Sequence, residues 1–190
     1  MDESKKPGKS DRTRAAILAA AREAFAAEGF ERATIRDIAA RAAIDPALVI
    51  RYFGSKEELF ARAADFDLRL PDFAGLDPTA IGPAIVEHFL EIWEGEGGNG
   101  GLTILLRSSA SNAIAAEKLR DVFAGQVLPA LARAGGGSDA AARVGLVSSQ
   151  LLGLALCRYV LKLPPLVGMP RERVIRDVGA TVQRYLGGAG

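Results

Sequence analysis

Residues 34–56 read TIRDIAARAAIDPALVIRYFGSK, and this stretch decides how the chain around it is organised. Thr34 stands just before an amphipathic run, which is where a helix N-cap belongs. The apolar residues that follow at helical spacing are Ile35, Ile38, Ala39 and Ala42. One stripe of this kind predicts a short helix that begins at Thr34 or the next residue and ends near residues 41–43.

A second short helix is predicted after a tight turn that carries Ile44, a small apolar side chain between the two helices. Asp45 can cap this second helix, and Pro46 stands at its first position, where a missing N–H group costs nothing. Gly54 is placed to end it. The residues on its buried side are Leu48, Val49, Tyr52 and Phe53. Two short helices joined by a tight turn have the geometry of a helix-turn-helix, whose second helix fits the major groove of DNA.

The segment from Arg12 to Ala64 resembles the DNA-binding domain of TetR-family transcriptional regulators. It contains TRAAILAAAREAFAAEGF at 13–30 and ATIRDIAARAAIDPALVIRYFGSKEELF at 33–60. The family pattern is a first helix ending in Gly-Phe or Gly-Tyr, a threonine that opens the second helix, the turn, and an aromatic-Phe-x-x-Lys-x-x-Leu close. All of these are present. The resemblance covers about a quarter of the chain, and the rest resembles the family's ligand-binding domain more loosely.

The composition predicts a packed helical protein. Of the 190 residues, 49% are hydrophobic and only 6% are aromatic, and alanine is abundant. This composition favours helices over sheets and a folded core over global disorder. The net charge is +1, but residues 1–56 hold eleven Lys/Arg against eight Asp/Glu. The slight excess fits either a DNA-contacting head or ordinary surface charge.

Several classes of protein are disfavoured. The single Cys157 allows no internal disulfide or cysteine metal cluster, and it suits a reducing cytoplasm. The N-terminus does not read as a signal peptide, and the longest apolar stretch, Val144 to Leu156, is expected to be too short to span a bilayer. With one histidine and no nucleotide or zinc motif, the sequence predicts no catalytic residue, no metal and no cofactor. We therefore expect a cytoplasmic protein that is not an enzyme and has no membrane partner.

The expected fold is all-α, with about nine helices in two domains. An N-terminal three-helix helix-turn-helix domain is joined by a linking helix to a C-terminal helical domain for ligand binding and dimerisation. The predicted boundaries are a disordered basic tail at 1–10, the helix-turn-helix domain at 11–56, the linking helix at about 56–70, and the body at 71–190. Within the body, helices are expected near 79–93, 102–111, 114–134, 140–162 and 170–186, separated by breaks rich in glycine or proline.

The resemblance implies a double-stranded DNA operator as partner. The candidate DNA-binding residues are Thr34, Arg36, Asp45, Pro46, Ala47, Leu48, Arg51, Tyr52 and Lys56. Arg51 is the only cation on the second helix and can reach guanine or a phosphate. Thr34 and Lys56 match the family's backbone-contacting positions, although Thr34 also serves as a cap and Lys56 can be a solvated cation. Ile50 lacks the hydroxyl that the family usually carries at its position, so the phosphate contact there is expected to shift to Arg51 or Tyr52.

A single helix-turn-helix buries too little surface to select one site in a genome, so a homodimer is expected to read two half-sites about 34 Å apart. In the family, the last two helices of each subunit form a four-helix bundle across a two-fold axis. The candidate interface residues are Leu146, Ser149, Gln150, Gly153, Leu154, Cys157, Val174, Val178, Thr181, Val182 and Tyr185. The alternative is that these stripes pack only within one subunit.

The resemblance also implies an unknown small-molecule effector bound in the body. The candidate lining residues are Phe66, His88, Phe89, Trp93, Leu106, Arg107, Phe123 and Leu152. Each can equally be ordinary core, His88 can be a satisfied surface histidine, and Arg107 can point to solvent. The expected function is a repressor released from a palindromic operator by this effector. The alternative is a helical ligand-binding or interaction module whose head does not bind DNA, for which Ile50 is the only hint.

Overall fold

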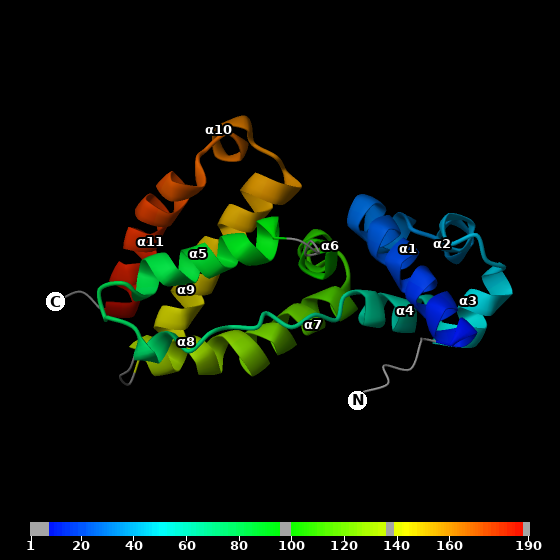
Figure 1. Ribbon diagram of the computed structural model, residues 1–190, viewed down its shortest axis with the longest axis horizontal. Coiled ribbons are helices and arrows are strands. Elements are labelled where there is room, and N and C mark those ends of the chain that lie inside the picture. Colours follow the sequence, from blue (N-terminus) through cyan, green and yellow to red (C-terminus); the bar gives the residue numbers. More distant parts are fainter. Residues whose placement is uncertain (1–7, 96–99, 136–138, 188–190) are drawn as a thin grey trace, which may run out of the picture. The chain divides into compact units, whose positions relative to one another are not determined.

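The computed structural model describes residues 8–95, 100–135 and 139–187, and all regular structure in these ranges is helical (Figure 1). The predicted all-α fold is confirmed. The described residues form two compact units: unit 1 contains residues 8–66 and 100–118, and unit 2 contains residues 67–95, 119–135 and 139–187. This grouping differs from the predicted boundary at residue 71, because residues 100–118 belong with the N-terminal unit.

Unit 1 holds the helix-turn-helix. Its elements are α1 (Lys9–Arg32), α2 (Ile35–Arg41), α3 (Pro46–Phe53), α4 (Lys56–Ala63), α6 (Gly100–Ser108) and the start of α7 (Ala113–Val122). The largest fully buried side chains among the first four helices are Ile17, Phe25, Ile38, Val49, Leu59 and Phe60. The ring of Phe60 meets Phe25 edge-on at 5.1 Å and Phe30 edge-on at 5.0 Å. Phe30 therefore contributes to this small core.

The α2–α3 junction is held by local hydrogen bonds. Thr34 Oγ1 accepts from the Asp37 N–H at 3.1 Å, and the Asp45 carboxylate accepts from the Ala47 N–H at 2.7 Å. Both predicted N-caps are therefore present. Between the helices Ala43 adopts φ 53°, a left-handed conformation that few non-glycine residues take. Local chemistry thus sets the start of each helix and the turn between them.

The two predicted glycine stops are also present, but the predicted tail is partly wrong. Gly29 (φ 76°) breaks the helical path of α1, and Gly54 (φ 80°) ends α3. A Cβ atom at Gly54 would overlap Glu58 Oε2. The helix α1 begins at Lys9, so residues 9 and 10 are helical rather than disordered. Residues 1–7 lie outside the described residues.

The helix α6 begins within the predicted glycine-rich loop at 95–101. Gly100 and Gly101 are helical, and a Cβ atom at Gly101 would lie only 3.2 Å from Phe66 Cδ1. The glycine therefore allows a close approach instead of breaking the helix. At the other end of α6 the buried Ser108 hydroxyl accepts from the Phe30 N–H at 3.4 Å. This contact fastens α6 to the C-terminal end of α1.

Unit 2 is a helical bundle. Its elements are a 3-10 turn (Phe73–Gly75), α5 (Ile81–Glu94), a π turn (Phe123–Val127), α8 (Leu128–Gly135), α9 (Ala140–Ala155), a second π turn (Leu156–Val160), α10 (Pro164–Val167) and α11 (Arg171–Gly187). Figure 1 shows α5 and α11 running side by side. At their crossing a Cβ atom at Gly179 would lie 2.8 Å from Pro83 Cα. The side chain of Gln183 accepts from the Gly82 N–H and donates to the Pro78 carbonyl, both at 2.7 Å, so α11 caps the start of α5.

The linking helix is shorter than predicted. The helix α4 ends at Ala63, and residues 65–70 are not helical. The Leu68 N–H donates to Gln126 Oε1 at 2.8 Å, and its carbonyl lies 2.9 Å from His88 Nε2. Because side chains from other elements of unit 2 satisfy these backbone groups, the segment does not need helical hydrogen bonds.

The helix expected near 114–134 is interrupted by the π turn Phe123–Val127, which lies just before Pro129. The helix α9 continues through the second π turn. The combined stretch Ala140–Val160 has 21 residues and a mean hydropathy of 1.5, and 22% of its apolar window is buried. By length and composition it can cross a membrane, which corrects the prediction that the apolar stretch is too short. One such helix is weak evidence for a span, because core helices of soluble proteins also have these properties.

Candidate nucleic-acid interface

The beginning of α3 is presented to solvent. Val49 and Phe53 are one helical turn apart and are buried against unit 1, so the opposite side of α3 faces outward. The predicted DNA-binding residues in and before this helix comprise exposed Asp45, Pro46, Ala47 and Arg51 and half-buried Leu48 and Tyr52. Ile50 is 43% exposed. The short side chains at the start of α3 leave room for a groove edge to approach.

Two candidate cations of the helix-turn-helix have free donors. Arg36 on α2 and Arg51 on α3 are exposed, and neither forms an ion pair or a hydrogen bond with any residue that the structure describes. An arginine side chain carries five N–H donors and no acceptor. Both guanidinium groups are therefore able to donate to phosphate oxygens or to guanine.

Lys56 and Thr34 are held by neighbours. The Lys56 ammonium lies 4.4 Å from the centre of the Phe30 ring and donates to the Glu31 carbonyl at 3.4 Å. Lys56 is thus positioned at the start of α4 instead of moving freely in solvent. The Thr34 hydroxyl, besides capping α2, donates to the Asp37 carboxylate at 2.6 Å.

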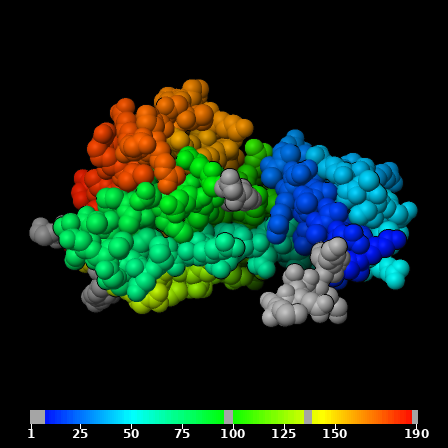
Figure 2. Space-filling view, in the orientation of Figure 1, coloured from blue at the N-terminus to red at the C-terminus, as the bar shows by residue number. Residues whose placement is uncertain are grey.

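Arg14, which the sequence analysis did not identify, lies beside α3. Its guanidinium carbon is 5.9 Å from the centre of the Tyr52 ring. Arg14 and Tyr52 help to line a cleft of about 670 Å³ between α1, α3 and α4, together with Leu18, Phe53, Gly54, Glu58, Ala61 and Arg62. In Figure 2 the blue surface of α1 borders the cyan surface of the helix-turn-helix. Local spacing carries no signal for this pair, because α1 and α3 meet only through packing.

The predicted effector residues are divided between the two units. Unit 1 contains Phe66, Leu106 and Arg107, and unit 2 contains His88, Phe89, Trp93, Phe123 and Leu152. Arg107 Nη1 donates to the Ala27 carbonyl at 3.2 Å and lines a hollow of about 260 Å³ at the α1–α6 junction. His88 is a satisfied histidine, since its Nε2 contacts Leu68 O and its Nδ1 lies 3.6 Å from Glu91.

Two of the effector candidates belong to an aromatic cluster in unit 2. The rings of Trp93 and Tyr159 stack at 4.8 Å with an interplanar angle of 7°. The Phe89 ring lies 6.0 Å from Trp93 and 6.4 Å from Tyr159. Sequence reasoning missed Tyr159, because it lies in a π turn that the helical pattern does not show.

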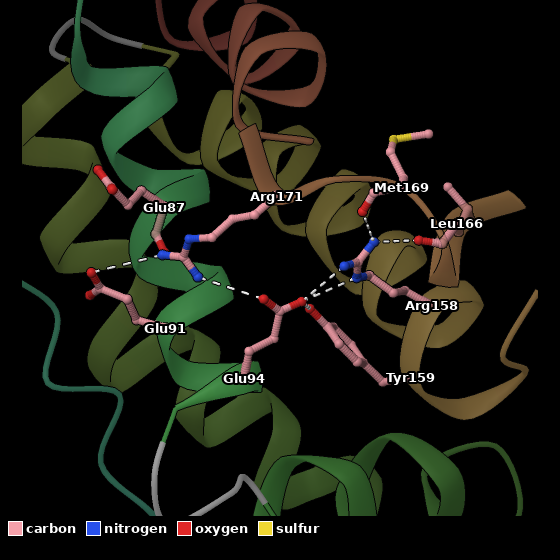
Figure 3. A network of polar contacts seen from close by, with 8 residues as sticks. All are labelled: Glu87, Glu91, Glu94, Arg158, Tyr159, Leu166, Met169 and Arg171. Atoms are coloured by element: carbon pink, nitrogen blue, oxygen red, sulfur yellow. Dashed lines mark hydrogen bonds and ion pairs between the residues drawn. The ribbon is translucent and has the colours of Figure 1, made fainter. Parts of the chain in front are cut away.

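The aromatic cluster adjoins a polar network centred on Glu94 (Figure 3). Tyr159 donates its hydroxyl to Glu94 Oε1 at 2.8 Å, and Arg158 donates to the same oxygen at 3.1 and 3.2 Å. Arg158 also donates to the carbonyls of Leu166 and Met169. Burial, together with the neighbouring Glu94 carboxylate, raises the pKa of the Tyr159 phenol well above its ordinary value. The network ties the end of α5 to the segment between α9 and α11.

The predicted dimer residues do not share one environment. Leu146 is 50% exposed, and Ser149 and Gly153 are also exposed on the outer side of α9. Those that are half-buried are Gln150, Cys157, Val178, Thr181 and Tyr185. Three of the predicted interface residues, Leu154, Val174 and Val182, are buried within unit 2. These three lie on the inner sides of α9 and α11, where a second copy cannot reach them.

Known proteins resemble both units. Residues 17–63 match the family described as bacterial regulatory proteins, tetR family, and residues 80–186 match the tetracyclin repressor-like C-terminal domain. An HTH-type transcriptional repressor from Mycobacterium tuberculosis is 42% identical over 64 residues. That match covers 34% of this chain and 34% of the relative, so the chain matches about a third of the relative's length.

Solved structures extend the similarity to nearly the whole chain. A TetR-family regulator from Streptomyces coelicolor is 33% identical, with a TM-score of 0.57 over 97% of this chain and 99% of that chain. A transcriptional regulator from a Rhodococcus species has a TM-score of 0.71 over 92% of this chain and 96% of that chain. Its identity is 24%, so this second likeness concerns the fold alone.

Proposed function

We propose that this chain, which belongs to the TetR family of bacterial transcriptional regulators, is a repressor that binds a palindromic DNA operator as a homodimer and leaves it when a small molecule binds. The observation that carries the proposal is the exposed start of α3, with Arg51 free to donate beside short side chains. A capped, rigid helix of this kind can enter the major groove and read base edges. A repressor of this type works in the cytoplasm.

Each candidate residue has a role in this proposal. Ala47 approaches a thymine methyl group, and Arg51 donates to guanine or to a phosphate. Asp45 and Pro46 set the first turn of α3 and thereby the angle at which the helix enters the groove. The residues assigned to the flanking phosphates are Thr34, Arg36, Tyr52 and Lys56, while Leu48 supports the helix from its half-buried side.

The homodimer uses the outer side of α9 together with the half-buried side of α11. The exposed apolar surface of Leu146 and the small residues Ser149 and Gly153 allow a second helix to approach closely. The remaining interface candidates are Gln150, Cys157, Val178, Thr181 and Tyr185. Two copies then present two recognition helices to half-sites about 34 Å apart or a multiple of that distance.

The effector site is assigned to unit 2, beside Phe89 and Trp93, with His88, Phe123 and Leu152 as further candidates. Both π turns of the described residues lie in this unit, and π turns recur at functional sites. The effector releases the operator only if it binds the DNA-free conformation more tightly than the DNA-bound one, and the coupling cannot exceed that difference in affinity.

Selection from random DNA tests the first half of the proposal. Purified protein is mixed with a pool of duplexes that carry a random core of about 26 base pairs, and bound duplexes are recovered and sequenced over several rounds. We expect enrichment of an inverted repeat whose half-sites are spaced by about one helical turn. Enrichment of no sequence would refute operator binding and leave the alternative, a helical ligand-binding module, for which the 43% exposed Ile50 is the supporting observation.

Arg51→Ala tests the recognition helix itself. Loss of the guanidinium contact is expected to weaken binding to the selected duplex by about 1–3 kcal/mol per contact. The matched control is Arg133→Ala, which removes the same charge from an exposed position on α8 and should leave the affinity unchanged. Equal affinities of wild type and Arg51→Ala, measured by fluorescence anisotropy at fixed salt, would exclude this role.

The effector half of the proposal has its own measurement. Trp93 is the only tryptophan of the chain, and its stacking on Tyr159 makes its fluorescence sensitive to a ligand beside it. Compounds that change this fluorescence are then tested for release of the selected duplex. If a broad library yields compounds that bind tightly beside Trp93, and none of them alters operator affinity, the assignment of the effector site is contradicted.

A further inference from the structure

The side chain of Arg14 reaches from α1 to the recognition helix. Its guanidinium lies over the ring of Tyr52 at 5.9 Å, and Tyr52 directly precedes the buried Phe53 that anchors α3. A cation–π contact of this kind uses no N–H group of the guanidinium, so those groups remain free to donate. The contact therefore orients Arg14 without using its hydrogen-bonding capacity.

Arg14 differs from Arg22 and Arg41, two other arginines of unit 1, in having free donors. Arg22 donates to the Ala63 carbonyl, and Arg41 donates to the Glu28 carboxylate at 2.6 Å. Arg14 is exposed, and its guanidinium forms no ion pair and no hydrogen bond with the described part of the chain. It is thus a charged group with five unused donors, held beside α3 by a ring of that helix.

The surroundings of Arg14 suit an anion. Arg14 and Arg62 both line the cleft of about 670 Å³ between α1, α3 and α4, and both are exposed. The cleft also contains one carboxylate, Glu58, which lies against Gly54 at the end of α3. Two cations against one anion leave a local excess of positive charge next to the helix that faces DNA.

We infer that Arg14 binds a DNA phosphate next to the bases that α3 reads, and that Tyr52 is the positioning residue that holds its guanidinium. The inference rests on the proposed operator binding. A phosphate contact from Arg14 would also replace one that Ile50 cannot make. The exposed side chain of Ile50 has no polar atom, so it cannot make the phosphate contact that is usual in the family at its position. The planar fork of arginine matches two oxygens of one phosphate, which lysine cannot do.

Salt dependence separates a phosphate contact from a packing effect. The probe is a duplex of about 30 base pairs that carries the inverted repeat recovered by selection, and affinity is measured between about 50 and 300 mM KCl. Arg14→Ala should weaken binding about tenfold per half-site, and the slope of log K against log salt should become less negative by about 0.9 per subunit. Arg14→Lys should retain most of the slope and lose part of the affinity.

Three further variants complete the test. Arg12→Ala removes the same charge two residues earlier on α1, where the side chain makes no ion pair, hydrogen bond or ring contact with the described residues. The loss of operator affinity in Arg12→Ala should be clearly smaller than in Arg14→Ala. Each Tyr52 variant is compared with and without Arg14→Ala. Tyr52→Phe keeps the ring, so adding Arg14→Ala should weaken operator binding as much as it does in wild type. Tyr52→Leu removes the ring, so adding Arg14→Ala should weaken binding less. Thermal midpoints of the Arg12 and Arg14 variants should stay within about 2 °C of wild type, because both side chains are exposed. The midpoints of the variants at the half-buried Tyr52 are measured alongside, so that a loss of folded protein is not mistaken for a loss of affinity.

The outcomes are distinct. A wild-type protein that selects no sequence refutes the proposed function. A wild-type protein that binds the selected duplex, with an unchanged affinity and salt slope in Arg14→Ala, refutes only the role of Arg14. Equal losses of operator affinity in Arg12→Ala and Arg14→Ala would show a general effect of charge and would also refute the specific role of Arg14.

Discussion

Ala43 is a residue at which the backbone of the helix-turn-helix is strained. Its φ of 53° places an alanine Cβ in the left-handed region, at a cost of about 1 kcal/mol or more compared with ordinary conformations. The turn keeps this conformation because the Ile44 N–H donates to the Ala39 carbonyl at 2.9 Å, and α3 begins immediately afterwards. The position of α3 relative to α2 is thus set by a turn that stores a small amount of strain.

Ala43→Gly is therefore expected to raise the free energy of unfolding by about 0.5–1 kcal/mol, since glycine takes this conformation without a steric penalty. The control is Ala40→Gly at an exposed position of α2. This change should lower the free energy of unfolding by about 1 kcal/mol, because glycine has a lower helix propensity than alanine. Both are measured by urea unfolding at one protein concentration. A loss of stability in Ala43→Gly as large as that in Ala40→Gly would contradict the strain argument.

Tyr159 couples protonation to stability. Burial and Glu94 raise the pKa of its phenol above the ordinary value of 10.0, so the native state holds the phenol proton more tightly than the unfolded chain does. The stabilisation that results is fully present below the unfolded-state pKa and is lost as the pH rises from there toward the native pKa. The absorbance titration of native protein at 295 nm should contain a late phase that Tyr159→Phe lacks. Identical titrations of the two proteins, apart from amplitude, would exclude the raised pKa.

At the scale of elements, the crossing of α5 and α11 depends on two glycines. A Cβ atom at Gly82 would overlap the Gly179 carbonyl, and one at Gly179 would press on the Pro83 backbone. Backbone atoms cannot move aside as a flexible side chain can, so the two helices approach closely only because both side chains are absent. The same approach brings Gln183 of α11 to the start of α5.

Gly179→Ala should lower the free energy of unfolding by about 1–3 kcal/mol, because the added methyl group must push α5 and α11 apart. Gly145→Ala is the matched control, since a Cβ atom at Gly145 meets nothing within 4 Å. That change should be neutral or should raise stability by up to about 1 kcal/mol through helix propensity. A Gly179→Ala protein as stable as the control would show that the crossing has room for a side chain.

At the scale of the whole molecule, the outer side of α9 is the feature that calls for a second copy. Leu146 and Leu156 are exposed on a helix of high hydropathy. A large exposed apolar surface on a soluble chain usually marks an interaction site. Association through α9 would bury this surface and would pair the two heads that operator recognition needs.

Leu146→Glu is expected to convert the protein to a monomer at micromolar concentration, because a carboxylate at the centre of the interface loses its hydration without gaining a partner. Equilibrium sedimentation measures the change, and operator affinity should fall with it. Leu76→Glu is the control, since Leu76 is 41% exposed outside α9 and α11 and should leave the assembly unchanged. A dimeric Leu146→Glu protein would place the interface elsewhere.

The sequence by itself determined the features that depend on near neighbours. The caps Thr34 and Asp45, the glycine breaks at Gly29 and Gly54, and the burial of Val49 and Phe53 all follow from residues within one or two turns. Such features rest on local hydrogen bonds and on allowed backbone conformations, which a short stretch of chain already specifies. The helix-turn-helix was therefore predictable, together with the candidate residues on α3.

Only the tertiary structure decided the features that depend on distant partners. The end of α4 at Ala63 follows from bonds that Gln126 and His88 make to Leu68, and the burial of Leu154 follows from the packing of α9 inside unit 2. The meeting of Arg14 with Tyr52 has the same origin. These contacts join residues far apart in the chain, and periodicity cannot show which of several apolar or charged faces will find a neighbour.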